Sequence, residues 1–205
     1  MLQFYSRLLP TVEINNSFYR YPKEETLQQW AETVPEGFIF SVKAHRRITH
    51  EKRLKEVDGD LVFLFERMRS LQSRLGLILF QLPPSLRCDL AVLETFLSQL
   101  RPGPRAVMEF RHATWRQDAV YRLLETHGVT LVIAETDEEA QPRDVVGPIS
   151  YLRLHKYQYA PEELQEWAGW IRQRVREGRD VFAYFTHEEG TPGPEYARAL
   201  AETTG

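Results

Sequence analysis

Side chains able to carry out acid/base chemistry lie near the ends of short apolar runs in this sequence. Glu13 follows Thr-Val, Glu109 follows Ala-Val-Met, and His155 follows Tyr-Leu-Arg-Leu. Carboxylates and imidazoles transfer protons near neutral pH when their surroundings adjust their pKa values. We therefore predict Glu13, Glu109 and His155 as catalytic residues. The alternative for both glutamates is a structural ion pair.

Cationic side chains occupy similar positions and indicate an anionic ligand. Lys43, Arg111 and Arg153 each lie at the end of a different apolar run. A guanidinium is planar and can bind phosphate or carboxylate oxygens through two hydrogen bonds. The alternative is that these cations only neutralise nearby acids. The other predicted substrate-binding residues, which could hydrogen-bond to a polar ligand or stack on it, are Asn15, Tyr19, His50, Gln81, Trp115 and Tyr184.

Two further patterns bear on metal and nucleic-acid binding. Several histidines lie just past the apolar runs: His50, His112, His155 and His187. None has the HExxH spacing of helical metal ligands, so we predict no metal site and identify no cofactor. A basic run could contact nucleic-acid phosphates or form a solvated face; it comprises His45-Arg46-Arg47, with Lys52, Arg53 and Lys55 nearby.

The composition is that of an ordinary globular protein. The 205 residues are 42% apolar and 27% charged, with a net charge of -3, which argues against a histone-like partner. The single cysteine, Cys88, cannot form an internal disulfide. No apolar stretch approaches the roughly 18 residues needed for a membrane span. We therefore expect a cytoplasmic protein without a membrane segment.

The chain alternates β-branched or aromatic runs with longer amphipathic stretches. Strands are expected at 11–16, 38–44, 77–82, 106–111, 129–134, 150–155 and 180–185. Helices are expected at 1–9, 23–34, 60–75, 90–100, 118–127, 161–177 and 195–202. This alternation predicts parallel βαβ units. Because no linker divides the chain, we expect one domain over residues 1–205.

Two architectures could hold these units, a (β/α) barrel and an open doubly wound sheet. Polar residues recur at every second position, such as Glu13 and Asn15, while the residues between them are apolar. Charges that converge from many strand ends are typical of the mouth of a TIM barrel, where active sites lie. A nucleotide-binding open sheet has a glycine-rich loop, which is absent from this sequence. The pattern favours an α/β, TIM-barrel-like fold with seven strand–helix units.

Six segments of the sequence resemble the YecE-like family, also called domain of unknown function 72. They are VEINNSFYRYP (12–22), VKAHRRITH (42–50), LGLILFQLPPS (75–85), MEFRHATW (108–115), YLRLHKYQY (151–159) and YFTHEEGTPGPEYARAL (184–200). The resemblance covers essentially the whole chain and implies a TIM-barrel-like fold. It implies no reaction, because the family is similar to endonuclease IV only at the level of the fold.

The sequence departs from the family pattern in three places. The first family strand and its loop are not recognisable, because residues 1–9 already look helical. Without that strand, the strands at 11–16 and 180–185 would have exposed edges. We therefore expect partial closure of the barrel, or association with a partner or a second copy. In the other two departures, Lys156 stands where the family has a glycine, and Thr186, His187 and Tyr196 or one of its neighbours stand where the family commonly has asparagines.

Three functions are compatible with these residues. The first is an enzyme, by fold analogy a hydrolase, that acts on a small anionic or sugar-phosphate-like substrate at the barrel mouth by carboxylate acid/base chemistry. The second is a nucleic-acid-binding protein or an endonuclease IV-like phosphodiesterase. The third is a degenerate, non-catalytic interaction module. Fold alone does not choose among them.

Overall fold

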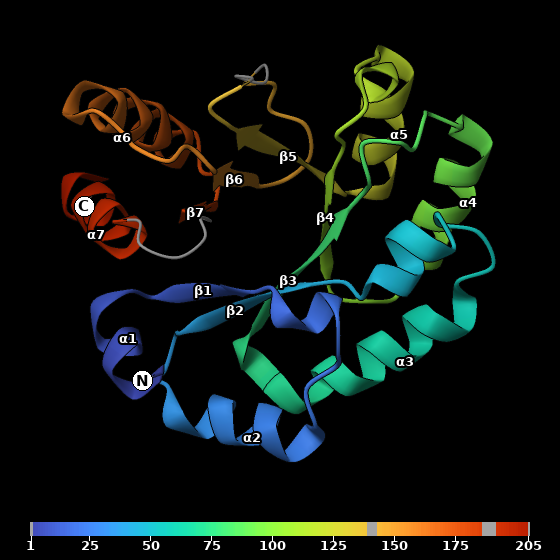
Figure 1. Ribbon diagram of the computed structural model, residues 1–205, viewed down its shortest axis with the longest axis horizontal. Helices are drawn as coiled ribbons and strands as arrows, with labels where there is room; N and C mark the ends of the chain where they lie inside the picture. Colours follow the sequence, from blue (N-terminus) through green and yellow to red (C-terminus); the bar gives the residue numbers. More distant parts are fainter. Residues whose placement is uncertain (1, 139–142, 186–191, 205) are drawn as a thin grey trace. The chain divides into compact units, whose positions relative to one another are not determined.

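A computed structural model describes residues 2–138, 143–185 and 192–204 (Figure 1). The predicted departures at Thr186 and His187 lie outside these residues. The chain divides into two compact units, residues 1–129 and residues 130–205, here called unit 1 and unit 2. Each unit contains its own run of parallel strands. No helix in the described ranges is long and apolar enough to cross a membrane.

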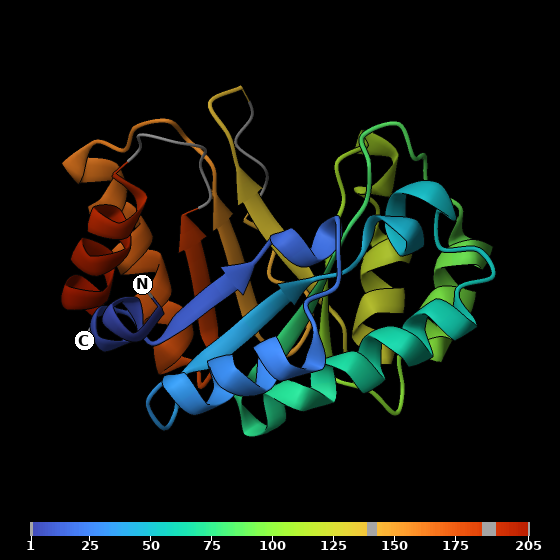
Figure 2. The same ribbon diagram turned by 60° about the horizontal axis from the view of Figure 1, so that its bottom comes forward.

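Unit 1 has four parallel strands that pair in the order of the sequence. They are β1 (Thr11–Ile14), β2 (Ile39–Lys43), β3 (Leu75–Gln81) and β4 (Arg105–Glu109). The first two run side by side in the same direction (Figure 2). The helices are α1 (Leu2–Leu8), α2 (Glu24–Thr33), α3 (Asp58–Met68), α4 (Leu90–Gln99) and α5 (Asp118–His127).

The two faces of the unit 1 sheet differ in polarity. On the helix side, Phe40 stacks on Trp30 of α2, and Phe80 packs edge-on against Phe96 of α4. Neighbouring side chains along a strand point to opposite faces. The residue that follows Phe80, Gln81, therefore lies on the other face, in register with Glu109. The structure thus confirms the predicted alternation in unit 1.

Unit 2 has three parallel strands and two helices. They are β5 (Thr130–Glu135), β6 (Ser150–Leu154), β7 (Val181–Phe185), α6 (Pro161–Arg176) and α7 (Gly193–Thr204). The two helices lie side by side (Figure 1 and Figure 2). Their core includes Leu152 and Leu154 of β6 packed with Trp167 of α6. On β6, Arg153 between these leucines therefore points to the opposite face.

Gln72 adopts a backbone conformation that favours glycine. It lies between α3 and β3 with φ 52° and ψ -132°, and its side chain is exposed. Such strain costs about 1–3 kcal/mol in a non-glycine residue. We expect Gln72→Gly to raise the free energy of unfolding by about 1 kcal/mol, because the relief exceeds the added entropy of glycine in the unfolded chain. Urea unfolding tests this, with Gln72→Ala as the control that keeps the strain. A glycine variant no more stable than the alanine variant would contradict the expectation.

Candidate functional site

Glu109 is a buried carboxylate at the end of β4. Its exposed fraction is 1%. Gln81 Nε2 donates to Glu109 Oε1 at 2.8 Å, and Arg111 Nε donates to the same oxygen at 3.0 Å. Hydrogen bonds from two donors favour the charged carboxylate. Three residues on the predicted list are therefore held together by direct contacts.

Arg111 links this buried carboxylate to the surface. Its side chain is 42% exposed, whereas that of Glu109 is 2% exposed. Within the described residues, Nε is the Arg111 nitrogen that forms a hydrogen bond. A guanidinium anchored through Nε can present its two terminal nitrogens to phosphate or carboxylate oxygens. Arg111 is therefore both a structural partner of Glu109 and a candidate anion-binding group.

Lys43 ends β2 and lies against an aromatic ring. Its Nζ is 4.3 Å from the centroid of the Phe18 ring, a cation–π contact. Phe18 belongs to the short 3₁₀ turn Asn16–Phe18 that follows β1. In this turn, the hydroxyl of the fully buried Ser17 lies 2.7 Å from the Lys43 carbonyl oxygen and 3.0 Å from that of Ile14. The turn thus ties the ends of β1 and β2 together.

His50 contacts the same aromatic ring. It lies in the π-helical turn Arg47–Glu51 that follows β2. Its ring meets Phe18 nearly at right angles, with 4.8 Å between the ring centroids. Thr49 Oγ1 lies 2.9 Å from His50 Nδ1. The imidazole is therefore held from two sides.

Cations from different segments influence the ionisation of His50. Burial lowers the pKa of His50 below its ordinary value of 6.5, and the charges of Lys43, Arg111 and Arg46 lower it further. A positive charge disfavours a second positive charge nearby. Lys43 and Arg111, which follow different strands, therefore act on one imidazole. An anion beside these groups would be attracted by both cations.

The carboxylate on β1 has a different local partner. Glu13 is 9% exposed, and Asn15 Nδ2 donates to its Oε1 at 3.0 Å. Glu13 lies in register with Ser41 of β2, on the face opposite the helices. Two further predicted residues, Glu13 and Asn15, are thus in direct contact. All of these residues follow or end strands of unit 1 at their carboxyl ends.

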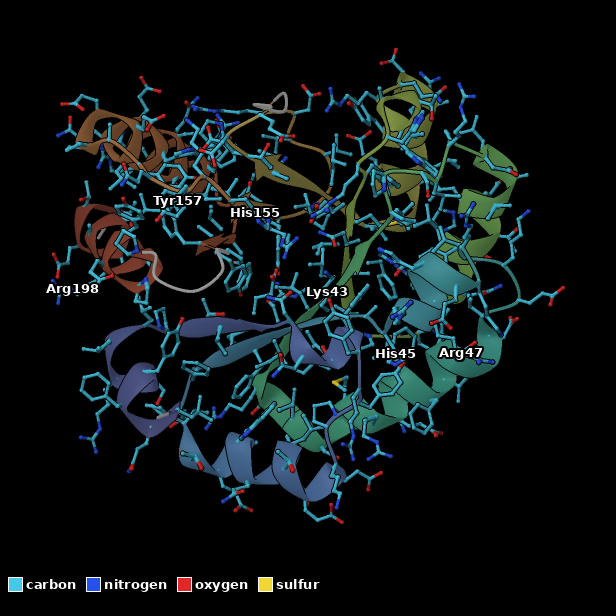
Figure 3. The ribbon with its side chains drawn as sticks, in the orientation of Figure 1. Lys43, His45, Arg47, His155, Tyr157 and Arg198 are labelled. Atoms are coloured by element: carbon cyan, nitrogen blue, oxygen red, sulfur yellow. The ribbon has the colours of Figure 1, made fainter. Side chains whose placement is uncertain are left out.

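Unit 2 carries three of the predicted site residues, Arg153, His155 and Tyr184. Arg153 of β6 is 3% exposed and lies in register with Tyr184 of β7, which is 6% exposed. His155 follows β6, and its backbone N–H donates to the carbonyl oxygen of Glu135 at 2.8 Å. Tyr157 lies two residues further along the same segment (Figure 3). Arg153 and Tyr184 thus share one sheet face within unit 2.

A cluster of charged side chains in unit 2 lies on the sheet face that packs against α6. Trp167 Nε1 donates to Glu135 Oε2 at 3.0 Å. Lys156 hydrogen-bonds to Glu163 and lies 3.9 Å from Glu135 Oε1. The bond to Glu163 raises the pKa of Lys156, and the same bond lowers the pKa of Glu163. Lys156 therefore offsets the charge of Glu163 and Glu135.

Two of the predicted aromatic residues have contrasting surroundings. Trp115 is 1% exposed, stacks on Phe110 with 4.6 Å between ring centroids, and donates from Nε1 to the Leu86 carbonyl oxygen at 2.7 Å. It packs the interior of unit 1. Tyr19 is 70% exposed and meets Phe18 edge-on at 4.9 Å. Tyr19 therefore has ring surface available to a ligand.

The basic run after β2 is offset by acidic partners. Arg46 pairs with Glu51 at 3.0 Å. Asp60 forms ion pairs with both Arg47, at 2.7 Å, and Lys52, at 2.8 Å. Figure 3 shows Lys43, at the end of β2, and Arg47, in the segment that follows it. Such pairing reduces the charge that the run offers to nucleic-acid phosphates.

Sequence reasoning missed Ser17, Phe18 and Thr49. Ser17 and Phe18 contact residues at or after the end of a different strand, which sequence spacing does not reveal, and Thr49 contacts its neighbour His50 within one turn. The one available signal is the position of Ser17 and Phe18 directly after a strand end, inside the NNSFYRYP segment. Within the described ranges, no group of three or more His, Cys, Asp or Glu side chains could hold a metal ion.

Comparisons with known proteins agree with this architecture. The family model described as "Protein of unknown function DUF72" matches residues 1–205. UPF0759 protein YunF of Bacillus subtilis is 25% identical, over 98% of this chain and 85% of that protein. A crystal structure of the DUF72 family protein EF0366 from Enterococcus faecalis has a TM-score of 0.85 at 21% identity, covering 98% of this chain and 92% of that one.

Two further solved structures are similar in fold. The DUF72 family protein TM1631 of Thermotoga maritima has a TM-score of 0.79 at 22% identity, covering 94% of this chain and 84% of that one. The glycoside hydrolase family 5 enzyme PbGH5A of Prevotella bryantii has a TM-score of 0.55 at 9% identity, covering 100% and 85%. With the parallel strands described above, these likenesses show an α/β, TIM-barrel-like fold. The match over the whole sequence shows that the chain belongs to the DUF72 family of proteins of unknown function.

Proposed function

We propose that this protein is an enzyme that binds a small anionic or sugar-phosphate-like substrate at the carboxyl ends of the unit 1 strands. One observation carries the proposal. Arg111 is anchored on the buried Glu109 at the end of one strand, and Lys43, at the end of another, contacts the same Phe18 ring as His50, whose pKa both cations lower. Cations that converge on a partly exposed imidazole favour an anion beside it. Strand carboxyl ends are also where TIM-barrel enzymes place their active sites.

The residues have different proposed roles. Arg111 and Lys43 bind the anionic group, and His50 hydrogen-bonds to it. Glu109, which is held by Gln81 and Arg111, acts as the general base. Glu13 is the second carboxylate of the acid/base pair, and Asn15 and Tyr19 contact the rest of the substrate. Unit 2 has its own candidate residues at the carboxyl ends of its strands: we propose Arg153 and Tyr184 as ligand-binding groups and His155 as an acid/base group.

Replacing the proposed base tests the catalytic part of this function. Glu109→Gln keeps an acceptor for Gln81 and Arg111 but cannot take up a proton. We expect wild-type protein to convert at least one member of a sugar-phosphate panel, followed by ³¹P NMR, and the variant to lose about 10²-fold or more of this rate. Inorganic phosphate should still bind the variant. Equal conversion by both proteins would contradict the role of Glu109.

The other functions have less support from the contacts. Nucleic-acid or phosphodiester binding would use the basic run, but Arg46, Arg47 and Lys52 all have acidic partners. A non-catalytic interaction module does not require Glu109 and Arg111 to be paired at a strand end. The likeness to a glycoside hydrolase, at 9% identity, concerns the fold alone.

The surroundings of the protein are also part of the proposal. A single cysteine, Cys88, suits a reducing compartment, so we propose that the protein is cytoplasmic. The sequence has no linker segment between the strand–helix units, which supports a single domain. Self-association through strand edges remains a prediction from the sequence. Size-exclusion chromatography tests it, and a stable monomer at high concentration would contradict it.

A further inference from the structure

We infer that Phe18 is a positioning residue of the proposed anion site, because its ring contacts both the Lys43 ammonium and the His50 imidazole. This inference rests on the proposed function and adds a residue that touches two of its ligand-binding groups. Phe18 itself has no group that could exchange a proton or bind an anion. Its proposed role is to fix where the charged groups lie before the ligand arrives.

The contacts of the Phe18 ring support this role. Lys43 Nζ lies 4.3 Å from the ring centroid. The His50 ring stands at 81° to the Phe18 ring, with 4.8 Å between centroids. An aromatic ring attracts a cation over its face, and perpendicular ring pairs are favourable. One side chain therefore contacts a cation from β2 and an imidazole from the turn after it.

The backbone that carries Phe18 is itself fixed to Lys43. The hydroxyl of Ser17, the residue before Phe18, lies 2.7 Å from the Lys43 carbonyl oxygen and is fully buried. This hydrogen bond therefore ties the turn that carries Phe18 to the main chain of Lys43. A side chain that is already ordered loses less entropy when a ligand binds. The turn thus preorganises the Lys43 ammonium for an anion.

The same contact determines the electrostatic surroundings of His50. Burial and the charges of Lys43, Arg111 and Arg46 all lower the pKa of His50. Arg46 is anchored by Glu51, and Arg111 by Glu109. Loss of the Phe18 ring would expose His50 and remove one of the contacts that position Lys43. Both changes would move the pKa of His50 upward, toward its ordinary value.

Three variants test the inference in the full chain. Phe18→Leu removes the ring, Phe18→Tyr keeps it, and Phe63→Leu is a matched control. Phe63 also has a cation over its ring, since the Arg67 guanidinium carbon lies 5.2 Å from its centroid, but it belongs to α3. The readouts are the dissociation constant for inorganic phosphate and the ¹H NMR titration of His50, assigned with His50→Gln. Thermal unfolding checks that each variant is folded.

We expect Phe18→Leu to weaken phosphate binding about threefold and to raise the pKa of His50. Phe18→Tyr and Phe63→Leu should match wild type in both readouts. The inference is overturned if Phe18→Leu changes neither readout, or if Phe18→Tyr behaves like Phe18→Leu. If wild type binds no phosphate but Phe18→Leu still raises the pKa of His50, Phe18 does position Lys43 and His50, and the proposed function fails. If wild type binds phosphate and Phe18→Leu leaves both readouts unchanged, the proposed anion site stands and the positioning role of Phe18 fails.

Discussion

Trp115→Ala is expected to lower the free energy of unfolding by about 3–5 kcal/mol, the usual cost of truncating a buried aromatic residue. Trp115 is 1% exposed and stacks on Phe110, with 9° between the ring planes. Its indole N–H also donates to the Leu86 carbonyl oxygen, which joins the loop after β4 to the loop after β3. Truncation would remove the stacking and leave the carbonyl of the half-buried Leu86 without this donor.

Urea unfolding measures this loss, and two variants separate its causes. Trp115→Phe keeps a ring against Phe110 but removes the hydrogen bond, so about 1–3 kcal/mol should be lost. Trp30→Ala is the matched control, because Trp30 also stacks on a strand phenylalanine but is only partly buried. It should cost less than Trp115→Ala. A loss below about 1 kcal/mol for Trp115→Ala would show that this packing does not hold the loops.

Arg111→Met is expected to weaken the binding of inorganic phosphate by about tenfold or more. A charge-assisted hydrogen bond from a guanidinium contributes about 1.5–3 kcal/mol, and methionine retains much of the apolar stem while removing every donor. The substitution also removes one of the two donors to the buried Glu109 Oε1. Some loss of stability should therefore accompany the loss of affinity.

Isothermal titration with phosphate measures the effect of Arg111→Met. The matched control is Arg69→Met, which alters an exposed arginine between α3 and β3, at the opposite end of the strands. Raising the ionic strength should weaken binding to wild type more than binding to Arg111→Met. If both methionine variants bind phosphate as wild type does, Arg111 is only a structural partner of Glu109.

The regular elements could be predicted because their signals are local. The helix at Asp118–His127 was expected at these bounds, and Gly128 ends it with φ 64°. The helix expected at 60–75 instead ends at Met68, and a 3₁₀ stretch interrupted at Gln72 follows. Apolar spacing continues through this stretch, so the pattern alone could not show where the helix ends.

The candidate site could be predicted in part. Alternation along the first strand predicted that Glu13 and Asn15 share one face, because side-chain direction follows from the period of a strand, and their side chains are in contact. Sequence spacing could not show that Phe18 lies over Lys43, since their contact depends on how two loops fold. Nor could it show that Trp115 is buried, because an aromatic residue after a strand can either pack or bind.

The acidic partners of the basic run show a similar limit. Glu51, which pairs with Arg46, lies close to it in sequence. Asp60, which pairs with Arg47, lies further along the chain, in the first turn of α3. The fold of the intervening loop decides whether these charges meet. Sequence alone therefore left a solvated face and a phosphate-binding face equally open.

The NMR titration of His50 with and without inorganic phosphate tests the central claim most directly. In the free protein, burial and the neighbouring cations should hold the pKa of His50 below 6.5. Bound phosphate would offset the charges of Lys43 and Arg111, so the account predicts a saturable rise of that pKa as phosphate is added. A His50 titration that phosphate leaves unchanged, while other resonances report an intact fold, would contradict an anion site at the carboxyl ends of these strands.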